Sequence, residues 1–188
     1  MEAQLQVYGY YFIEDLLPDP IVENFKAHME NFYTYPFDTF LTDRTTLAQL
    51  YIGNKITAME RLRTMGFLSK YFDVDLYTGS DTSSLPLIHN KGLAKSLTEM
   101  PIIFHESKIN LNTTSKAIRS GLPLRIFDIL GCGGFVLTNY QTELTDLFVL
   151  NEDIVAYSSL EEANDLITYY LEHESLREEI AFNGYEKV

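Results

Sequence analysis

The chain has 188 residues, of which 46% are hydrophobic and 22% charged, and its formal net charge is −13 at pH 7. This composition excludes an intrinsically disordered protein and predicts one globular domain, alone or with an appendage. The acidity argues against nucleic acid as a partner. The single cysteine, Cys132, excludes an internal disulfide and favours a reducing, cytoplasmic setting. No apolar run approaches a membrane span and no signal sequence follows Met1, so we expect a soluble, unanchored chain.

The first 45 residues predict an N-terminal segment with one helix. Residues 4–13 are aromatic-rich and suit a strand, or a piece cut from a larger protein. Asp19 can cap a helix that has Pro20 at its first position, and apolar residues then recur at helical spacing as far as Phe32. We expect this segment to be a linker or appendage to a domain that covers residues 46–188.

Residues 47–72 fit two structures. The spacing of their apolar residues predicts a helix from about Thr57 to Phe72, whereas residues 51–54 fit either the same helix or a strand that ends in a glycine turn. This stretch also carries three basic side chains that either point into solvent or contact a phosphate: Lys55, Arg61 and Arg63.

From residue 73 onward, short apolar strands alternate with helices. The expected strands cover residues 73–79, 87–90, 109–113, 135–138 and 153–157, and the expected helices cover residues 98–107, 124–130, 143–148, 160–171 and 175–188. Thr98 can cap one of these helices, and Ser159 with Glu162 forms a capping box before another. Such alternation predicts an α/β fold, namely a Rossmann-like open parallel sheet of about five strands with helices on both faces.

The stretch from Lys108 to Asn139 predicts a βαβ unit whose loop lies at the carboxyl end of a parallel strand, a place where ligands bind. Free backbone amides at residues 121–125 and the dipole of the following helix favour a phosphate there. Arg125 and Arg119 can add charge-assisted hydrogen bonds to a diphosphate. Asp128, one turn beyond Arg125, either accepts hydrogen bonds from sugar hydroxyls or pairs with Arg125 on the surface.

The charges are segregated in a way that bears on this loop. Residues 1–43 carry eight acidic and one basic side chains, residues 44–125 six acidic and eleven basic, and residues 126–188 thirteen acidic and two basic. A positive middle segment raises the local concentration of an anionic ligand. It can equally be a run of solvated surface charges, and the sequence leaves both origins open.

Motifs of self-contained enzymes are missing from the sequence. It has no G-x-S-x-G elbow, CxxC, HExxH or P-loop, and the glycines of residues 131–134 follow a helix instead of opening one, so they are not a dinucleotide fingerprint. These missing motifs leave no sequence signal for a metal site or a bound cofactor.

The stretch SKINLNTTSKAIRSGLPLRIFDILGCGGFVLTNYQTEL resembles the donor-binding signature of group 1 glycosyltransferases of the GT-B fold, and within them it is similar to the spore-maturation-protein branch. The resemblance extends from about residue 57 to 188 and includes MERLR and DVDLYT. It implies the C-terminal half of a bacterial enzyme, which binds a nucleotide-diphospho-sugar without a metal. The acceptor-binding half, with any catalytic base, would be an N-terminal domain outside this chain, and the abrupt end at Val188 suggests an excised domain.

In that superfamily the loop carries two acidic residues with seven residues between them. The second, a ribose contact, corresponds to Asp128, whereas the first, a sugar contact, corresponds to Ser120, which is not acidic. Residues 121–124 match the stretch that approaches the donor phosphate, and residues 89–92 match the loop beside the nucleobase. The donor-binding residues implied by loop chemistry and resemblance together are Lys55, Arg61, His89, Asn90, Asn112, Arg119, Ser120, Gly121, Leu122, Leu124, Arg125 and Asp128.

Two other functions stay open. A non-catalytic binding or interaction module would keep the fold without activity, and Ser120 in place of an acid favours it. A receiver-like or flavodoxin-like domain would require an acidic cluster at the end of the first strand, which the sequence lacks. The leading hypothesis is a donor-binding glycosyltransferase domain that transfers a sugar to an unknown acceptor only with its N-terminal partner.

Overall fold

A computed structural model describes residues 13–34, 42–118 and 120–188, which form two compact units. Of these residues, unit 1 takes 13–34, 42–60 and 115–118, and unit 2 takes 61–114 and 120–188. The boundary expected after residue 45 therefore falls inside unit 1. Most of the strand expected at residues 4–13 lies outside the described residues; its last residue, Ile13, begins a short helix.

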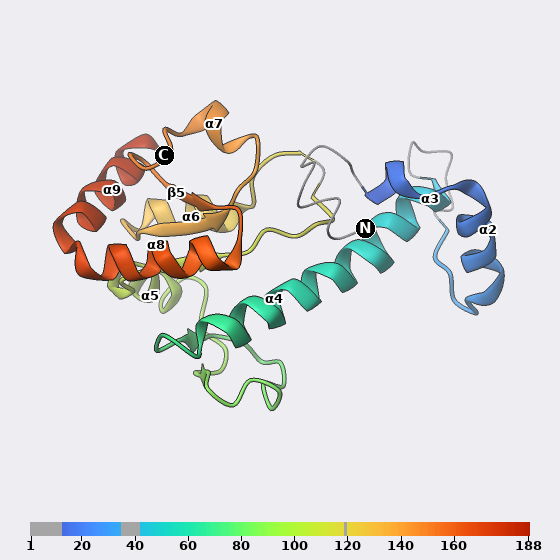
Figure 1. The fold of residues 1–188 in the computed structure, drawn as a ribbon, viewed down its shortest axis with the longest axis horizontal. Coiled ribbons are helices and arrows are strands. Elements are labelled where there is room, and N and C mark those ends of the chain that lie inside the picture. The colour runs from blue at the N-terminus through green and yellow to red at the C-terminus, as the bar shows by residue number, and fades with distance from the viewer. Residues whose placement is uncertain (1–12, 35–41, 119) are drawn as a thin grey trace. The chain divides into compact units, whose positions relative to one another are not determined.

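Unit 1 is helical in its described part (Figure 1). Its elements are η1 (Ile13–Leu16), α2 (Asp19–His28), α3 (Asp43–Thr46), η2 (Leu47–Gly53) and the first residues of α4 (Asn54–Leu68). A small core holds them together, in which Leu47 and Ala48 pack with Ile13, Leu17 and Val22.

The structure decides one open question in unit 1 and corrects one predicted cap. Residues 51–54 do not form a strand; η2 is a π-helical turn that continues into α4, because burial of Leu47 and Ala48 holds the chain helical here. The cap of α2 is Pro18, and Asp19 is the first helical residue without a side-chain capping bond. The helix starts at the expected place because Pro20 still suits its first turn.

Unit 2 contains five described strands, all parallel. β1 (Asp75–Leu76) pairs with β2 (His89–Asn90), and a second sheet has the order β3-β4-β5, formed by β3 (Asn110–Asn112), β4 (Val136–Asn139) and β5 (Val155–Tyr157). This confirms the Rossmann-like parallel arrangement, although the five strands hydrogen-bond as groups of two and three. Apart from β4, the strands are shorter than the runs that predicted them.

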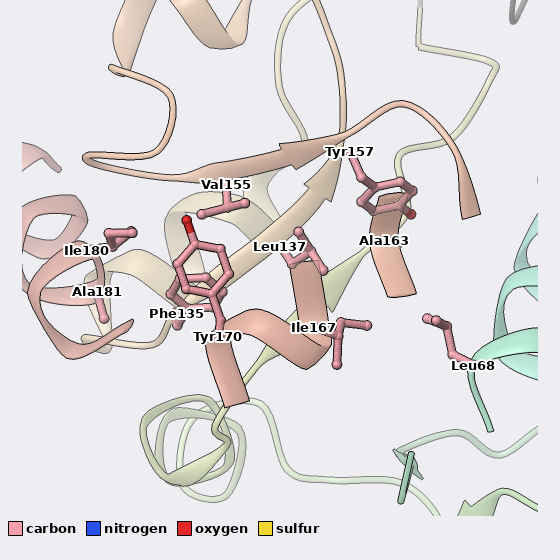
Figure 2. Close-up of a cluster of buried hydrophobic side chains, with 10 residues drawn as sticks. All are labelled: Leu68, Phe135, Leu137, Val155, Tyr157, Ala163, Ile167, Tyr170, Ile180 and Ala181. Carbon is pink, nitrogen blue, oxygen red and sulfur yellow. The ribbon is translucent and has the colours of Figure 1, made fainter. Parts of the chain in front are cut away.

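Helices cover both faces of the three-stranded sheet. They are α5 (Met100–Glu106), α6 (Leu124–Gly131), α7 (Leu144–Leu147), α8 (Leu160–Glu172) and α9 (Glu174–Lys187). Successive residues of β4 point to opposite faces: Leu137 packs in the cluster under α8 and α9, and Val136 in the cluster with α5 and α6. Figure 2 shows the first cluster, in which Ile167 and Tyr170 of α8 meet the sheet. Alternating burial on the central strand is what a sheet covered on both faces requires.

The predicted cap of α5 is wrong, and the predicted cap of α8 is confirmed in part. Thr98 does not cap α5; Glu99 precedes it without a side-chain capping bond. Ser159 caps α8 as expected by accepting from the Glu162 amide at 3.1 Å, but the Glu162 carboxylate accepts from the amide of Ser158, not of Ser159. In the described part of the chain, no helix is both long and apolar enough to cross a membrane.

Candidate functional site

The carboxyl ends of β3 and β4 lie side by side because the two strands are parallel and in register, with Asn112 opposite Thr138. The Asn112 side chain is buried, and its amide donates to Oγ1 of Thr138 at 2.9 Å and to Oγ1 of Thr114 at 3.1 Å. Both amide hydrogens of Asn112 are thus used inside the protein, where they join the two strand ends. Asn112 was expected to contact a ligand, and its amide instead supports the edge where the loop begins.

Three polar side chains follow one another at every second position from the end of β4 to the start of α7. They are Asn139, Gln141 and Glu143. The Thr114 amide donates to Oδ1 of Asn139 at 2.7 Å, and the Thr114 hydroxyl donates to Oε1 of Gln141 at 2.8 Å. These side chains were missed in the sequence, although an i, i+2, i+4 polar spacing after an apolar strand is a signal that they share one side.

Two of these side chains, Gln141 and Glu143, hold the backbone of Gly121 through its carbonyl and its amide. Nε2 of Gln141 donates to the Gly121 carbonyl at 3.3 Å, and the Gly121 amide donates to Oε1 of Glu143 at 3.2 Å. Gly121 has a φ of +83°, which a side chain would rarely tolerate. The residue expected to approach a phosphate is therefore placed by the turn after β4.

The helix that follows the loop begins where the sequence predicted. Pro123 caps α6 with an extended backbone, and α6 runs from Leu124 to Gly131. Leu122 packs partly into the core beside α6, whereas the Leu124 side chain is 78% exposed. Their expected contribution is through backbone amides, and the amides of Leu124 and Arg125 donate no hydrogen bond within the described residues.

Arg125 and Asp128 are both exposed on α6. The Arg125 guanidinium lies 5.1 Å from the centre of the Phe104 ring, and among the described residues no ion pair joins it to Asp128. The alternative of a surface pair between them is therefore wrong. A cation stacked on a ring keeps its N–H groups directed outward, so the fork of Arg125 stays accessible to an anion.

The other predicted residues are distributed over both units. Arg61 donates to the Thr113 carbonyl at 3.1 Å and so lies at the carboxyl end of β3, and Ser120 is exposed beside Gly121. Lys55 is an exposed residue of unit 1, and Arg119 lies outside the described residues.

The first part of the loop belongs to unit 1, where it docks on the helical segment. The Lys116 amide donates to Oγ1 of Thr57 at 2.9 Å, and its ammonium lies 3.6 Å from Oε1 of Glu60. Lys116 is therefore one of the positive charges of the middle segment that has an acidic partner within the protein.

His89 and Asn90, which make up β2, belong to a separate group of polar side chains. Nδ1 of His89 and Nζ of Lys91 each lie 3.3 Å from Oδ1 of Asp75. The Asn90 amide donates to Oγ1 of Thr82 at 3.2 Å, and its carbonyl accepts from the Gly92 amide at 2.9 Å. The imidazole of His89 is about half exposed, so it stays accessible at the loop expected beside a nucleobase.

The part of the chain that the structure describes holds no group of three or more His, Cys, Asp or Glu side chains placed to bind a metal ion. Comparison with known proteins adds one finding. Residues 69–188, which include all five described strands, match the family described as glycosyl transferase-like. The search of curated proteins found no match.

Proposed function

The chain belongs to the glycosyl transferase-like family, and on that premise we propose that unit 2 is the donor-binding half of a GT-B glycosyltransferase. Its ligand would be a nucleotide-diphospho-sugar, and its branch would be the spore-maturation-protein type. The observation that carries the proposal is the loop from Ser120 to Arg125, at the carboxyl edge of parallel strands and at the start of α6. That edge is where ligands bind in open parallel sheets.

The loop supports phosphate binding by its free amides. Leu124 and Arg125, at the start of α6, have amides that make no hydrogen bond within the described residues, and the positive end of the helix dipole adds to their pull on an anion. Arg125 supplies a planar cation that can bind two phosphate oxygens at once. Arg61, held at the end of β3, lies at the carboxyl edge of the same sheet and supplies a second cation.

The remaining contacts follow from geometry and resemblance together. Asp128 lies one turn beyond Arg125 on α6, where its exposed carboxylate can accept from ribose hydroxyls. Ser120 would meet the donor sugar with a hydroxyl in place of the family's acid. His89 and Asn90, with Gly92, would border the nucleobase.

The proposed reaction breaks the bond between the donor sugar and its diphosphate and forms a bond from the sugar to an acceptor. The nucleoside diphosphate leaves with the electron pair, and its charge would be stabilised by the loop amides, the α6 dipole and the arginines. This chain would supply no catalytic base and would need an N-terminal acceptor-binding domain. We place the reaction in the bacterial cytoplasm, where nucleotide sugars are the donors.

Calorimetry with UDP, GDP and their sugar conjugates tests the proposal. Arg125→Ala should weaken binding by about 1.5–3 kcal/mol, because a hydrogen bond to a charged group is lost. Asp128→Asn should weaken it less, through the ribose alone. The matched control is Lys108→Ala, which removes one exposed positive charge before the amino end of β3 and should leave affinity unchanged. Failure of the folded chain to bind any of these nucleotides at millimolar concentration would refute donor binding.

A second candidate is a non-catalytic module that keeps the fold, and Ser120 in place of an acid favours it. The gene around this chain separates the two candidates. A Rossmann-like domain encoded upstream would favour the enzyme, and an unrelated partner domain would favour the module.

A further inference from the structure

We propose that Glu143 is an internal competitor of the donor: its carboxylate occupies the Gly121 amide that the donor diphosphate must take over. The inference rests on the proposed function, because it concerns the same loop. It assigns a role to a residue of the turn between β4 and α7, which the resemblance leaves without one.

The contact itself is the first argument. The Gly121 amide, one of the backbone donors expected to face a phosphate, donates to Oε1 of Glu143 at 3.2 Å. A carboxylate and a phosphate present the same kind of acceptor, an anionic oxygen, to a backbone amide. One N–H group cannot serve both fully, and two anions held at one amide repel each other. Binding a diphosphate at Gly121 therefore requires the Glu143 side chain to move.

Glu143 also does not cap the helix that follows it. It directly precedes α7, where a side chain commonly caps the helix, yet it makes no capping hydrogen bond to that helix. Its carboxylate instead reaches back across 22 residues of sequence to the loop. The α7 amides have other partners. Within the described residues, the contact with Gly121 is the one hydrogen bond of this carboxylate.

The neighbouring Gln141 shows how the loop stays in place when the carboxylate leaves. Gln141 joins the Thr114 hydroxyl to the Gly121 carbonyl through opposite ends of its amide. It is neutral and bonds to the carbonyl, so an incoming phosphate does not compete with it. Gln141 thus holds the loop in both states, whereas Glu143 exchanges with the ligand.

The opposite role makes the opposite prediction. If Glu143 merely supported the loop in its binding geometry, its removal would loosen Gly121 and weaken the binding of a diphosphate. If it competes, removal frees an amide and deletes a nearby negative charge, and binding becomes tighter. The sign of the change in affinity separates the two roles.

Three variants of the full chain carry the test. Glu143→Ala removes the contact and the charge, and Glu143→Gln removes the charge but keeps a weak acceptor. Asp146→Asn is the matched control, because it removes a negative charge from an exposed α7 carboxylate that accepts no hydrogen bond from the described residues. The probes are UDP, GDP and inorganic pyrophosphate, measured by calorimetry, together with the NMR signal of the Gly121 amide without any probe.

We expect Glu143→Ala to bind the diphosphates about three- to tenfold more tightly than wild type, with a smaller gain for Glu143→Gln and less than about twofold for Asp146→Asn. The Gly121 amide signal should shift in Glu143→Ala but not in Asp146→Asn. Equal or weaker binding by Glu143→Ala, or an unshifted Gly121 signal, overturns this proposal alone. Absence of binding by wild type and every variant overturns the proposed function, and this inference with it.

Discussion

Gly134→Ala tests the packing that places the loop. Gly134 lies between α6 and β4, and a Cβ built there would stand 2.5 Å from the Phe104 carbonyl oxygen and 2.8 Å from Nδ2 of Asn110. Real Cβ atoms do not approach other heavy atoms so closely. The same Asn110 nitrogen donates to the Phe104 carbonyl at 2.9 Å and to the Phe135 carbonyl at 3.2 Å, so the methyl group would push apart an established buried hydrogen bond.

The expected cost has two parts. Overpacking a dense interior costs about 1–3 kcal/mol, and disturbing the buried Asn110 hydrogen bonds costs about 1–3 kcal/mol more. We therefore expect Gly134→Ala to lower the free energy of unfolding by about 2–6 kcal/mol and the melting temperature by about 4–24 °C. Urea denaturation followed by circular dichroism measures the first quantity, and a thermal scan measures the second.

Gly131→Ala is the matched control three residues earlier. A Cβ at Gly131 would meet no atom within 4 Å, and the residue ends α6 without a positive φ. Its substitution should change stability by less than about 1 kcal/mol, and in the stabilising direction, because alanine loses less backbone freedom on folding. If both alanine variants unfold at the same urea concentration, the inference that α5, α6 and β3 pack tightly around Gly134 is refuted.

Three further variants test other parts of the fold. Leu137→Ala, at a fully buried position of the central strand, should lose about 2–5 kcal/mol in urea denaturation, and a loss below 1 kcal/mol would contradict its place in the core. Arg177→Ala should cost about 1.5–3 kcal/mol by the same assay, because the buried guanidinium donates to the Tyr170 carbonyl at 2.7 Å; an unchanged midpoint would count against that contact. In unit 1 a hydrogen bond from Lys26 lowers the pKa of Asp43, so this pair stabilises the fold above the ordinary carboxyl pKa of 3.8 and loses that effect as pH falls through the lowered value. Melting temperatures measured from pH 7 to pH 2 should therefore fall less steeply in Asp43→Asn, and parallel curves would refute the linkage.

The order of elements in unit 2 was predictable from the sequence because it depends on local chemistry. Apolar runs of strand length alternate with helical patterns, and the residues that start helices act on their nearest neighbours: Pro123 precedes α6, and Ser159 caps α8. Where the local signal was ambiguous, at residues 51–54, burial of Leu47 and Ala48 decided for a helix.

The candidate site, too, has a part that could be predicted from the sequence and a part that could not. Gly121, Pro123 and Arg125 could be predicted as a candidate anion-binding loop, because a glycine, a helix start and a cation close together in sequence have a local meaning. That Arg125 stacks on Phe104 and does not pair with Asp128 could not be predicted, since α5 brings the ring from a distant part of the sequence.

By itself, then, the sequence determined an α/β chain of parallel strands and the position of the loop that we propose as a phosphate site. Only the tertiary structure decided how that loop is held. The hydrogen bonds from Asn112 to Thr138, from Gln141 to the Gly121 carbonyl and from the Gly121 amide to Glu143 each join residues 20 or more positions apart. No local pattern specifies such partners, because they meet only when β3 and β4 pair in register and bring their carboxyl ends together.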